Sequence, residues 1–157
     1  MRKNLDFQTR RDELLKAFEA TKEVVLSTCS ANRVTSRVVS TACHEDKIYF
    51  LSWEHHVKCL QIRDNPQVAF CHANIQIEGN ASILGNSLDR ENIAYSEKYK
   101  VKQPGIFEAF TKFQGMVIVE VSITKIRSYV QENGEYCLDC LNFAEKKAYR
   151  ENMKIGV

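Results

Sequence analysis

The strand that decides the fold reads Val34-Thr35-Ser36-Arg37-Val38-Val39-Ser40-Thr41-Ala42-Cys43. Its β-branched residues favour extended backbone, and the polar pair Glu45-Asp46 predicts a tight turn after it. A second predicted strand runs from Lys47 to Ser52 and leads into a short helix that ends at Asn65-Pro66. The helix is expected to end there because proline restricts the residue before it to extended backbone. The short turn implies that the two strands are antiparallel neighbours.

Three side chains of this stretch are suited to hold one phosphate. Arg37 lies on the first strand, and Ser52 and Lys58 lie at the start of the predicted helix. A helix N-terminus offers free N–H groups and partial positive charge, and a guanidinium presents paired donors that match a phosphate. Each residue also has an ordinary alternative: Arg37 suits a solvated strand, Lys58 suits a helix surface, and Ser52 suits an N-cap.

The composition is that of one globular domain. We expect residues 1–157 to form a single domain, because this length suffices for a core of its own. The net charge of +2 gives no general electrostatic case for nucleic acid. The basic start Met1-Arg2-Lys3 is not followed by an apolar run, so no signal peptide is expected, and no stretch approaches the length of a membrane span. These features predict a cytoplasmic protein with no nucleic-acid or membrane partner.

The rest of the chain predicts a mainly β fold of the α+β class. The expected helices cover 4–20, a segment from Asn86 or Ser87 to about Lys100, and 106–113. Further strands are expected at 24–29, 67–72, 75–84, 116–121 and 135–141. Gly79 predicts a bulge, Asn133-Gly134 predicts a hairpin turn, and the polar tail from Glu145 is expected to be helical or frayed. Six or seven short strands at this spacing predict a small antiparallel barrel with a few flanking helices.

The six cysteines divide into two groups. Four of them, Cys29, Cys43, Cys59 and Cys71, are interpreted as reduced structural thiols, because no export signal is seen. The motif Cys137-Leu138-Asp139-Cys140 is a CxxC, which suits a redox pair, half of a zinc site or a structural role. We predict no metal site, since there is no second CxxC and the histidines are far away in the sequence. Residues three apart on a strand face opposite sides, and nearby acids disfavour a thiolate, so we expect no redox role.

Five segments, in their order and spacing, resemble the FMN-binding split-barrel family named after pyridoxamine 5′-phosphate oxidase. They are Ser36-Arg37-Val38-Val39, Ile48-Tyr49-Phe50-Leu51-Ser52, Lys58-x-x-x-Ile62-x-x-Asn65-Pro66, Gln67-Val68-Ala69 and Ile77-Glu78-Gly79-Asn80-Ala81. The similarity runs from about Glu23 to Leu84, with a weaker echo from Met116 to Val130. The resemblance implies a Greek-key split barrel and a homodimer that holds FMN in two symmetric grooves at its interface.

The resemblance also implies a set of cofactor-binding residues. These are Arg37 and Lys58 at the FMN phosphate, Ser52 near it, the backbone of Val38 and Val39 at the flavin ring, and Gln76 or Glu78 from the partner subunit. Trp53 either stacks near the flavin or covers the rim of the core. Of the adjacent His55 and His56, at most one is expected to face the ligand, because neighbouring helical residues point in different directions. His56 is the candidate.

Two classes of function stay open. The first is an FMN-dependent oxidoreductase, a reductase or oxidase of a small molecule, with NADH or NADPH as the candidate electron donor. The second is a non-catalytic flavin- or haem-binding carrier or a stress-response protein, for which His72 is the candidate axial ligand of a haem. The Arg-x-His motif that holds the substrate of the founding oxidase is not found near the C-terminus, so oxidation of pyridoxamine phosphate is not expected. GxSxG, HExxH and P-loop motifs are also missing, which fits a protein whose cofactor supplies the chemistry.

Overall fold

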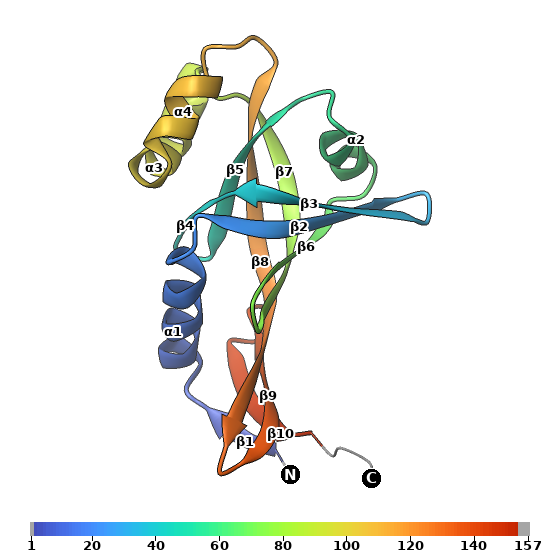
Figure 1. Cartoon of the computed structure of the whole chain (residues 1–157), viewed down its shortest axis with the longest axis vertical. Coiled ribbons are helices and arrows are strands. Elements are labelled where there is room, and N and C mark those ends of the chain that lie inside the picture. Colours follow the sequence, from blue (N-terminus) through green and yellow to red (C-terminus); the bar gives the residue numbers. More distant parts are fainter. Residues whose placement is uncertain (1, 154–157) are drawn as a thin grey trace.

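The computed structural model describes residues 2–153 and shows a mainly β chain with four α-helices (Figure 1). The helices are α1 (Phe7–Glu19), α2 (Val57–Asp64), α3 (Ile93–Lys102) and α4 (Pro104–Phe110), with a 3-10 turn at Arg90–Asn92. The strands are β1 (Arg2–Leu5), β2 (Glu23–Ser30), β3 (Arg33–Ser40), β4 (Ala42–His44), β5 (Lys47–Trp53), β6 (Gln67–His72), β7 (Ile75–Asn86), β8 (Met116–Glu132), β9 (Glu135–Asn142) and β10 (Lys147–Asn152).

The ten strands of the described residues join one antiparallel sheet. Its main path is β1-β10-β9-β8-β7-β6-β2-β3, and β5 pairs with both β8 and β4. The first half of β8, residues 116–122, pairs with β5 and β7, and the second half, residues 125–132, pairs with β9 and β7. Figure 1 shows this long strand running through the molecule, with α3 and α4 near one end and the β1–β10–β9 sheet at the other. The predicted fold class is confirmed: the chain has a split-barrel-like α+β fold, with β1 and β10 as short additions to the predicted strands.

The start of β8 faces two hydrophobic cores. Val117, Val119 and Val121 pack in the core inside the barrel, together with residues of α1, β2, β5 and β6. Ile118 packs on the opposite face, in a second core beneath α3 and α4. Both faces of this segment are therefore covered, which explains why residues 116–119 are all apolar rather than alternating with polar residues. Glu120 follows on the face of Ile118, where it accepts hydrogen bonds from Lys47 and Tyr49.

Two turn and bulge predictions are confirmed. The register of β7 against β8 shifts between Glu78 and Gly79, as expected for a bulge. A Cβ on Gly79 would lie 2.5 Å from Val121 Cγ1 and 2.7 Å from the Ser122 carbonyl oxygen, so only glycine fits here without movement. Asn133 and Gly134 both have positive φ and connect β8 to β9 as a tight hairpin.

Three sequence-based boundaries are wrong. The tail from Glu145 is not helical or frayed over its next residues, because β10 is paired with β9 on one side and β1 on the other. The helix expected from Asn86 or Ser87 begins at Ile93 instead, after the 3-10 turn, and Ser87 is buried. The strand predicted for 34–43 is interrupted at Thr41. The pairing of the tail with β1 from the other end of the chain and the burial of Ser87 are tertiary effects, which local patterns do not report.

Among the described residues, no helix combines the length and the apolar character needed to cross a membrane.

Candidate cofactor site

The Arg37 side chain, on β3, is held by hydrogen bonds to the neighbouring strand β2 and to Thr35 of its own strand. Its Nη1 donates to the Leu26 carbonyl oxygen at 3.2 Å and to Thr28 Oγ1 at 2.8 Å, and its Nη2 donates to Thr35 Oγ1. The guanidinium is partly buried, and desolvation lowers the pKa of Arg37 from its ordinary value. No carboxylate of residues 2–153 forms an ion pair with it. Arg37 is thus a positioned cation whose charge is not neutralised within the described chain.

Gln61 connects this arginine to α2. The hydroxyls of Thr28 and Thr35 each donate to Gln61 Oε1 at 2.6 Å, and Gln61 Nε2 donates to the Arg33 carbonyl oxygen at 2.9 Å. The bonds run in one direction, from the guanidinium to the hydroxyls and from the hydroxyls to the amide oxygen. Since each hydroxyl both accepts and donates, the network fixes the position of Arg37 relative to α2.

Lys58 lies in the first turn of α2, close to Arg37. Its Nζ is 3.3 Å from His56 Nδ1. Desolvation is the main cause that lowers the pKa of Lys58; Cys59 opposes the shift, and the charge of Arg37 adds to it. The pKa of His56 is lowered by desolvation and by the charges of Lys58 and His55. Two partly buried cations therefore repel each other beside a helix N-terminus, and Lys58 also forms no ion pair with an acid among residues 2–153.

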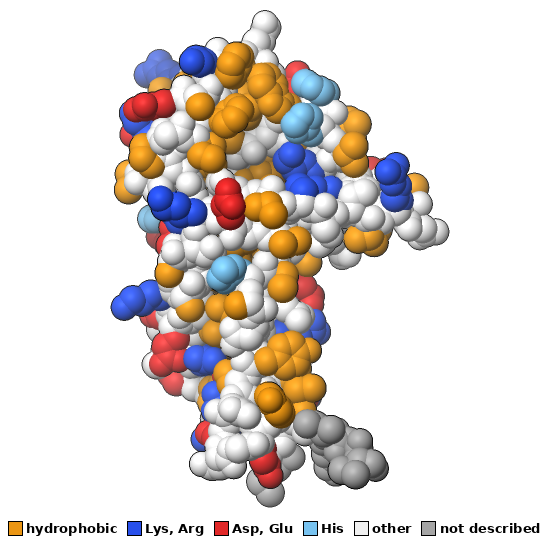
Figure 2. All heavy atoms as spheres, viewed as in Figure 1, with side chains coloured by type: hydrophobic (Ala, Val, Ile, Leu, Met, Phe, Trp, Pro, Cys, Tyr) orange, Lys and Arg blue, Asp and Glu red, His pale blue; other side chains and the backbone are white. Residues whose placement is uncertain are grey.

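A groove of about 240 Å³ lies beside these cations, between β3, β5, α2 and the α3–α4 helices. Its lining residues are Val38, Val39, Ser40, Leu51, Ser52, Trp53, His56, Lys58, Tyr99, Ile106, Phe110 and Met116. Six of the nine predicted cofactor residues are thus brought together, and Arg37 lies next to them. In Figure 2 hydrophobic side chains gather at this end of the molecule, next to histidine side chains and a group of lysine or arginine atoms.

The predicted residues of β5 and the loop after it have defined local contacts. Ser52 does not cap α2, because its Oγ donates to the Trp53 carbonyl oxygen at 3.1 Å and His56 occupies the N-cap position. The Trp53 ring lies 5.5 Å from the Phe113 ring and also lines the groove. His55 and His56 are both exposed and their rings meet edge-on, and His56 is the one of the pair that lines the groove.

Gln76 and Glu78 lie on β7, outside this groove. Glu78 forms ion pairs with Arg127 and Lys125 of β8. Cross-strand partners share one face of a sheet, and the register links Val38 to Val25, Val25 to Cys71 and Cys71 to Gln76. Val38 and Gln76 are therefore on the same outer face, three strand spacings or about 14 Å apart. A role for β7 at a flavin site stays a prediction that requires a partner subunit.

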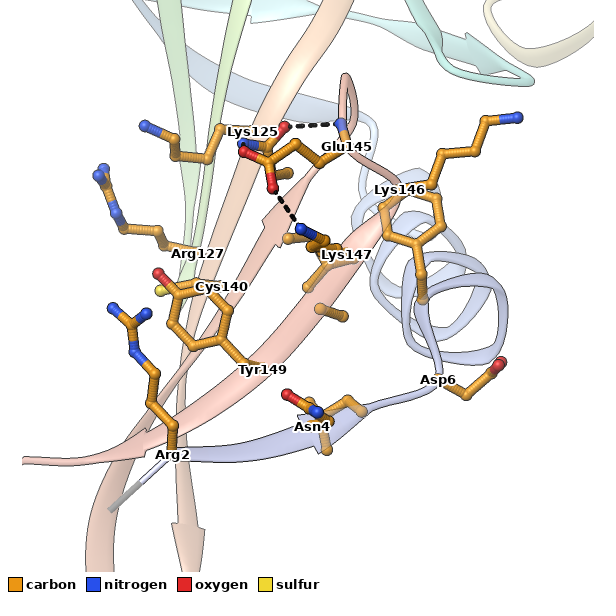
Figure 3. Close-up of a pocket in the computed structure, with 15 residues that line it drawn as sticks. Arg2, Asn4, Asp6, Lys125, Arg127, Cys140, Glu145, Lys146, Lys147 and Tyr149 are labelled. Atoms are coloured by element: carbon orange, nitrogen blue, oxygen red, sulfur yellow. Dashed lines mark hydrogen bonds and ion pairs between the residues drawn. The ribbon is translucent and has the colours of Figure 1, made fainter.

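A larger cavity, of about 870 Å³, lies at the other end of the molecule between β1, β8, β9 and β10 (Figure 3). Several basic residues line it, but most of them already have carboxylate partners. Arg2 pairs with Glu151 and Lys147 pairs with Glu145, while the two basic residues of β8 share Glu78. This cavity therefore lacks the unneutralised, partly buried pair of cations that marks the smaller groove.

The CxxC lies on β9, and its cysteines face opposite sides of the strand as predicted. Cys140 lines the larger cavity, and Cys137 Sγ lies 3.4 Å from Asn152 Oδ1; both are free thiols. The acid within the motif is compensated by arginines that are distant from it in the sequence. Asp139 is fully buried and accepts hydrogen bonds from Arg10 at 2.7 Å and from Arg150 at 2.6 Å. Within the described chain, no group of three or more His, Cys, Asp or Glu side chains could hold a metal ion.

A scan against protein-family models finds no match, and no curated protein matches the sequence. Solved structures do match. A pyridoxamine 5′-phosphate oxidase-related, FMN-binding protein from Nostoc punctiforme has a TM-score of 0.61 at 12% identity, covering 96% of this chain and 98% of that chain. A FAD-binding protein from Mesorhizobium loti has a TM-score of 0.61 at 12% identity, covering 96% and 99%. The haem storage protein HutZ from Vibrio cholerae has a TM-score of 0.60 at 11% identity, covering 76% and 91%.

These likenesses identify the fold: the chain has the split-barrel fold of pyridoxamine 5′-phosphate oxidase-like, FMN-binding proteins. The same fold carries proteins described as haem-binding, so the fold alone does not choose the ligand. The residues of the groove must therefore be used to decide between a flavin and a haem.

Proposed function

We propose that the chain is an FMN-binding protein and acts as an oxidoreductase on a small molecule. FMN would occupy the groove between β3, β5 and α2, with its phosphate between Arg37 and Lys58. Bound FMN would supply reversible hydride or electron transfer, while the protein positions the cofactor and excludes water. The proposed setting is the cytoplasm, with NADH or NADPH as the candidate electron donor.

One observation carries the proposal. Arg37 and Lys58 are partly buried, have lowered pKa values, and pair with no carboxylate of residues 2–153. A desolvated cation is unfavourable unless an opposite charge compensates it, and perturbed groups of this kind gather at binding sites. The first N–H groups of α2 have no partner in a helix, so they add donors at the same place. A terminal phosphate, as in FMN, supplies the missing negative charge and the acceptors.

The rest of the groove suits a flat ring system. Val38 is 59% exposed beside the buried Val39, and both lie on β3, the last strand of the sheet path, whose outer edge presents unpaired backbone groups. Leu51 and Trp53 line the side formed by β5, and Ile106 and Phe110 line the side formed by α4. An apolar cleft with a few charged groups at one end is the usual form of a cofactor site.

The proposal includes a homodimer, because the groove opens onto an exposed outer face. Val25, Val34 and Val38 are exposed on that face, although each is a large apolar residue. A two-fold axis would cover these side chains with the same face of a second copy. The same packing would bring Gln76 or Glu78 toward the partner's groove. Within one chain these two residues lie outside the groove.

The first experiment compares ligands directly. Purified apo-protein is titrated with FMN, FAD and riboflavin, and binding is followed by flavin fluorescence. The proposal predicts that FMN binds tightest, because the anion site is sized for one terminal phosphate. Arg37→Glu should weaken FMN binding strongly, whereas Arg33→Glu, on an exposed residue of the same strand, should not. Equal affinity for FMN and riboflavin would remove the phosphate assignment.

A second experiment separates an enzyme from a carrier. The absorption spectrum of the protein as purified distinguishes flavin from haem. His72, the candidate haem ligand, lies on β6 and does not line the groove. Anaerobic mixing of the FMN-loaded protein with NADH or NADPH should bleach the flavin if the protein is a reductase. A flavin that stays oxidised with both donors would favour a carrier or an oxidase.

A further inference from the structure

Two phenylalanines at the rim of the groove are unusually exposed. Phe110 at the end of α4 is 41% exposed, and Phe113 in the turn that follows is 44% exposed. Phe110 lines the groove, and the Phe113 ring contacts the ring of Trp53, another lining residue. Large aromatic side chains are normally buried, and here they form an apolar wall beside the proposed flavin.

This wall offers no charge to a ligand. The lining residues supplied by α3, α4 and the start of β8 are Tyr99, Ile106, Phe110 and Met116. The hydroxyl of Tyr99 is already used, since it donates to the Ser40 carbonyl oxygen at 3.3 Å. Lys112, which precedes Phe113, is exposed and does not line the groove; its Nζ lies 5.8 Å from the centre of the Phe113 ring. The cations of the site are Arg37 on β3 and Lys58 on α2, and the phosphate of FMN would bind between them.

We propose that the α4 side of the groove binds a flat, uncharged aromatic compound as the substrate, and that Phe110 and Phe113 determine this preference. The inference rests on the flavin assignment above, because Arg37 and Lys58 must be occupied by FMN. Offset or edge-on contacts with aromatic rings favour a planar substrate. A phosphate or carboxylate on that substrate would be desolvated against this wall without a partner, which is unfavourable.

The test compares two probes that share one ring system. Menadione is a neutral naphthoquinone, and naphthoquinone sulfonate carries a fixed negative charge. Each is titrated into the oxidised, FMN-loaded protein, with calorimetry and the shift of the flavin absorption bands as readouts. We expect menadione to bind and the sulfonate to bind at least about tenfold more weakly.

A charge placed in the wall should reverse the preference. Phe110→Lys supplies the missing cation at an exposed position that should tolerate it, so the sulfonate should gain affinity and menadione should lose it. Tyr136→Lys is the matched control, because Tyr136 is an exposed aromatic residue on β9 outside the groove. It should leave both affinities unchanged.

The outcomes separate the two proposals. Failure of the wild-type protein to bind FMN is seen before any probe is added and removes the proposed function. Normal FMN binding with equal affinity for both probes, or no effect of Phe110→Lys on their ratio, overturns the substrate inference alone. If the wild type binds neither probe and Phe110→Lys halves the mass measured by light scattering, the two phenylalanines form a subunit contact and the inference is also overturned.

Discussion

Replacing Lys58 with methionine should separate binding from folding. Lys58 is partly buried, its Nζ contacts His56 Nδ1, and it pairs with no acid of the described chain. Burial and the nearby Arg37 lower its pKa, so the ammonium is unfavourable in the protein without ligand. Methionine has a similar length and keeps the apolar contacts. Apo-protein carrying Lys58→Met should be as stable as wild type or more stable, by up to about 1 kcal/mol.

Lys58→Met should weaken the binding of FMN, although it does not destabilise the apo-protein. A charge-assisted hydrogen bond to a phosphate contributes about 1.5–3 kcal/mol, which corresponds to a roughly 10- to 150-fold change in affinity. Lys58→Met should therefore weaken FMN binding by about this factor. Riboflavin has no phosphate, so its affinity should change little.

Urea denaturation followed by circular dichroism measures the stability of the apo-protein, and flavin fluorescence measures the two affinities. Lys112→Met is the matched control, because Lys112 is exposed and outside the groove lining. Equal losses of affinity for FMN and riboflavin would show that Lys58 supports the flavin ring site or the fold rather than binding the phosphate. A marked loss of apo stability with FMN affinity intact would refute the reasoning altogether.

Four further predictions follow from the described contacts. Gly79→Ala should lower the free energy of unfolding by about 1–3 kcal/mol, because its Cβ would lie 2.5 Å from a valine of β8; an unchanged urea midpoint would contradict this. Asp139→Asn should cost about 3–5 kcal/mol in the same assay, since two largely buried arginines lose their shared counter-charge, and a change near zero would refute the buried ion network. The pKa of Lys58 is lower in the folded apo-protein than in the unfolded chain, so at pH values between the two the unfolded chain binds more protons. The free energy of unfolding of wild type, relative to that of Lys58→Met, should therefore rise with pH in this alkaline range. A constant difference between the two proteins across alkaline denaturation curves would argue against it. The double variant Cys137→Ser/Cys140→Ser should keep the FMN spectrum and the rate of flavin reduction, and loss of turnover with FMN still bound would make β9 part of the active site.

Much of the barrel could be predicted because its strands are bounded by strong local signals. The turns at 31–32 and 133–134 have positive φ, and they set the register of the hairpins around them. The apolar run at the start of β8 and the bulge at Gly79 are also visible in the sequence. By contrast, β1 and β10 are short and polar. β10 forms a hairpin with β9, and β1 is a strand because it pairs with β10 from the other end of the chain. Local patterns contain no information about such pairing.

The candidate site was predictable in part. The order of Arg37, Ser52 and Lys58 along the chain predicts one anion site. In the structure Ser52 and Lys58 line one groove and Arg37 lies beside it, while their role in binding an anion stays a prediction. Gln61 was missed, together with Thr28 and Thr35. A signal did exist, because the turn after β2 sets Thr28 opposite Thr35, and Gln61 follows Lys58 by three residues on the same helix face. The α4 wall could not be predicted, since Phe110 and Phe113 look like core residues until the fold leaves them exposed.

The central claim is that Arg37 and Lys58 hold the phosphate of FMN, and phosphorus NMR of the bound cofactor tests it most directly. Free FMN has a phosphate that loses its second proton near pH 6, about the usual value for a phosphomonoester. Two neighbouring cations and the N-terminus of α2 favour the dianion, so the phosphate pKa of bound FMN should fall well below that value. In Arg37→Gln it should move back toward the free value. A bound phosphate that titrates like free FMN in the wild-type protein would contradict the account.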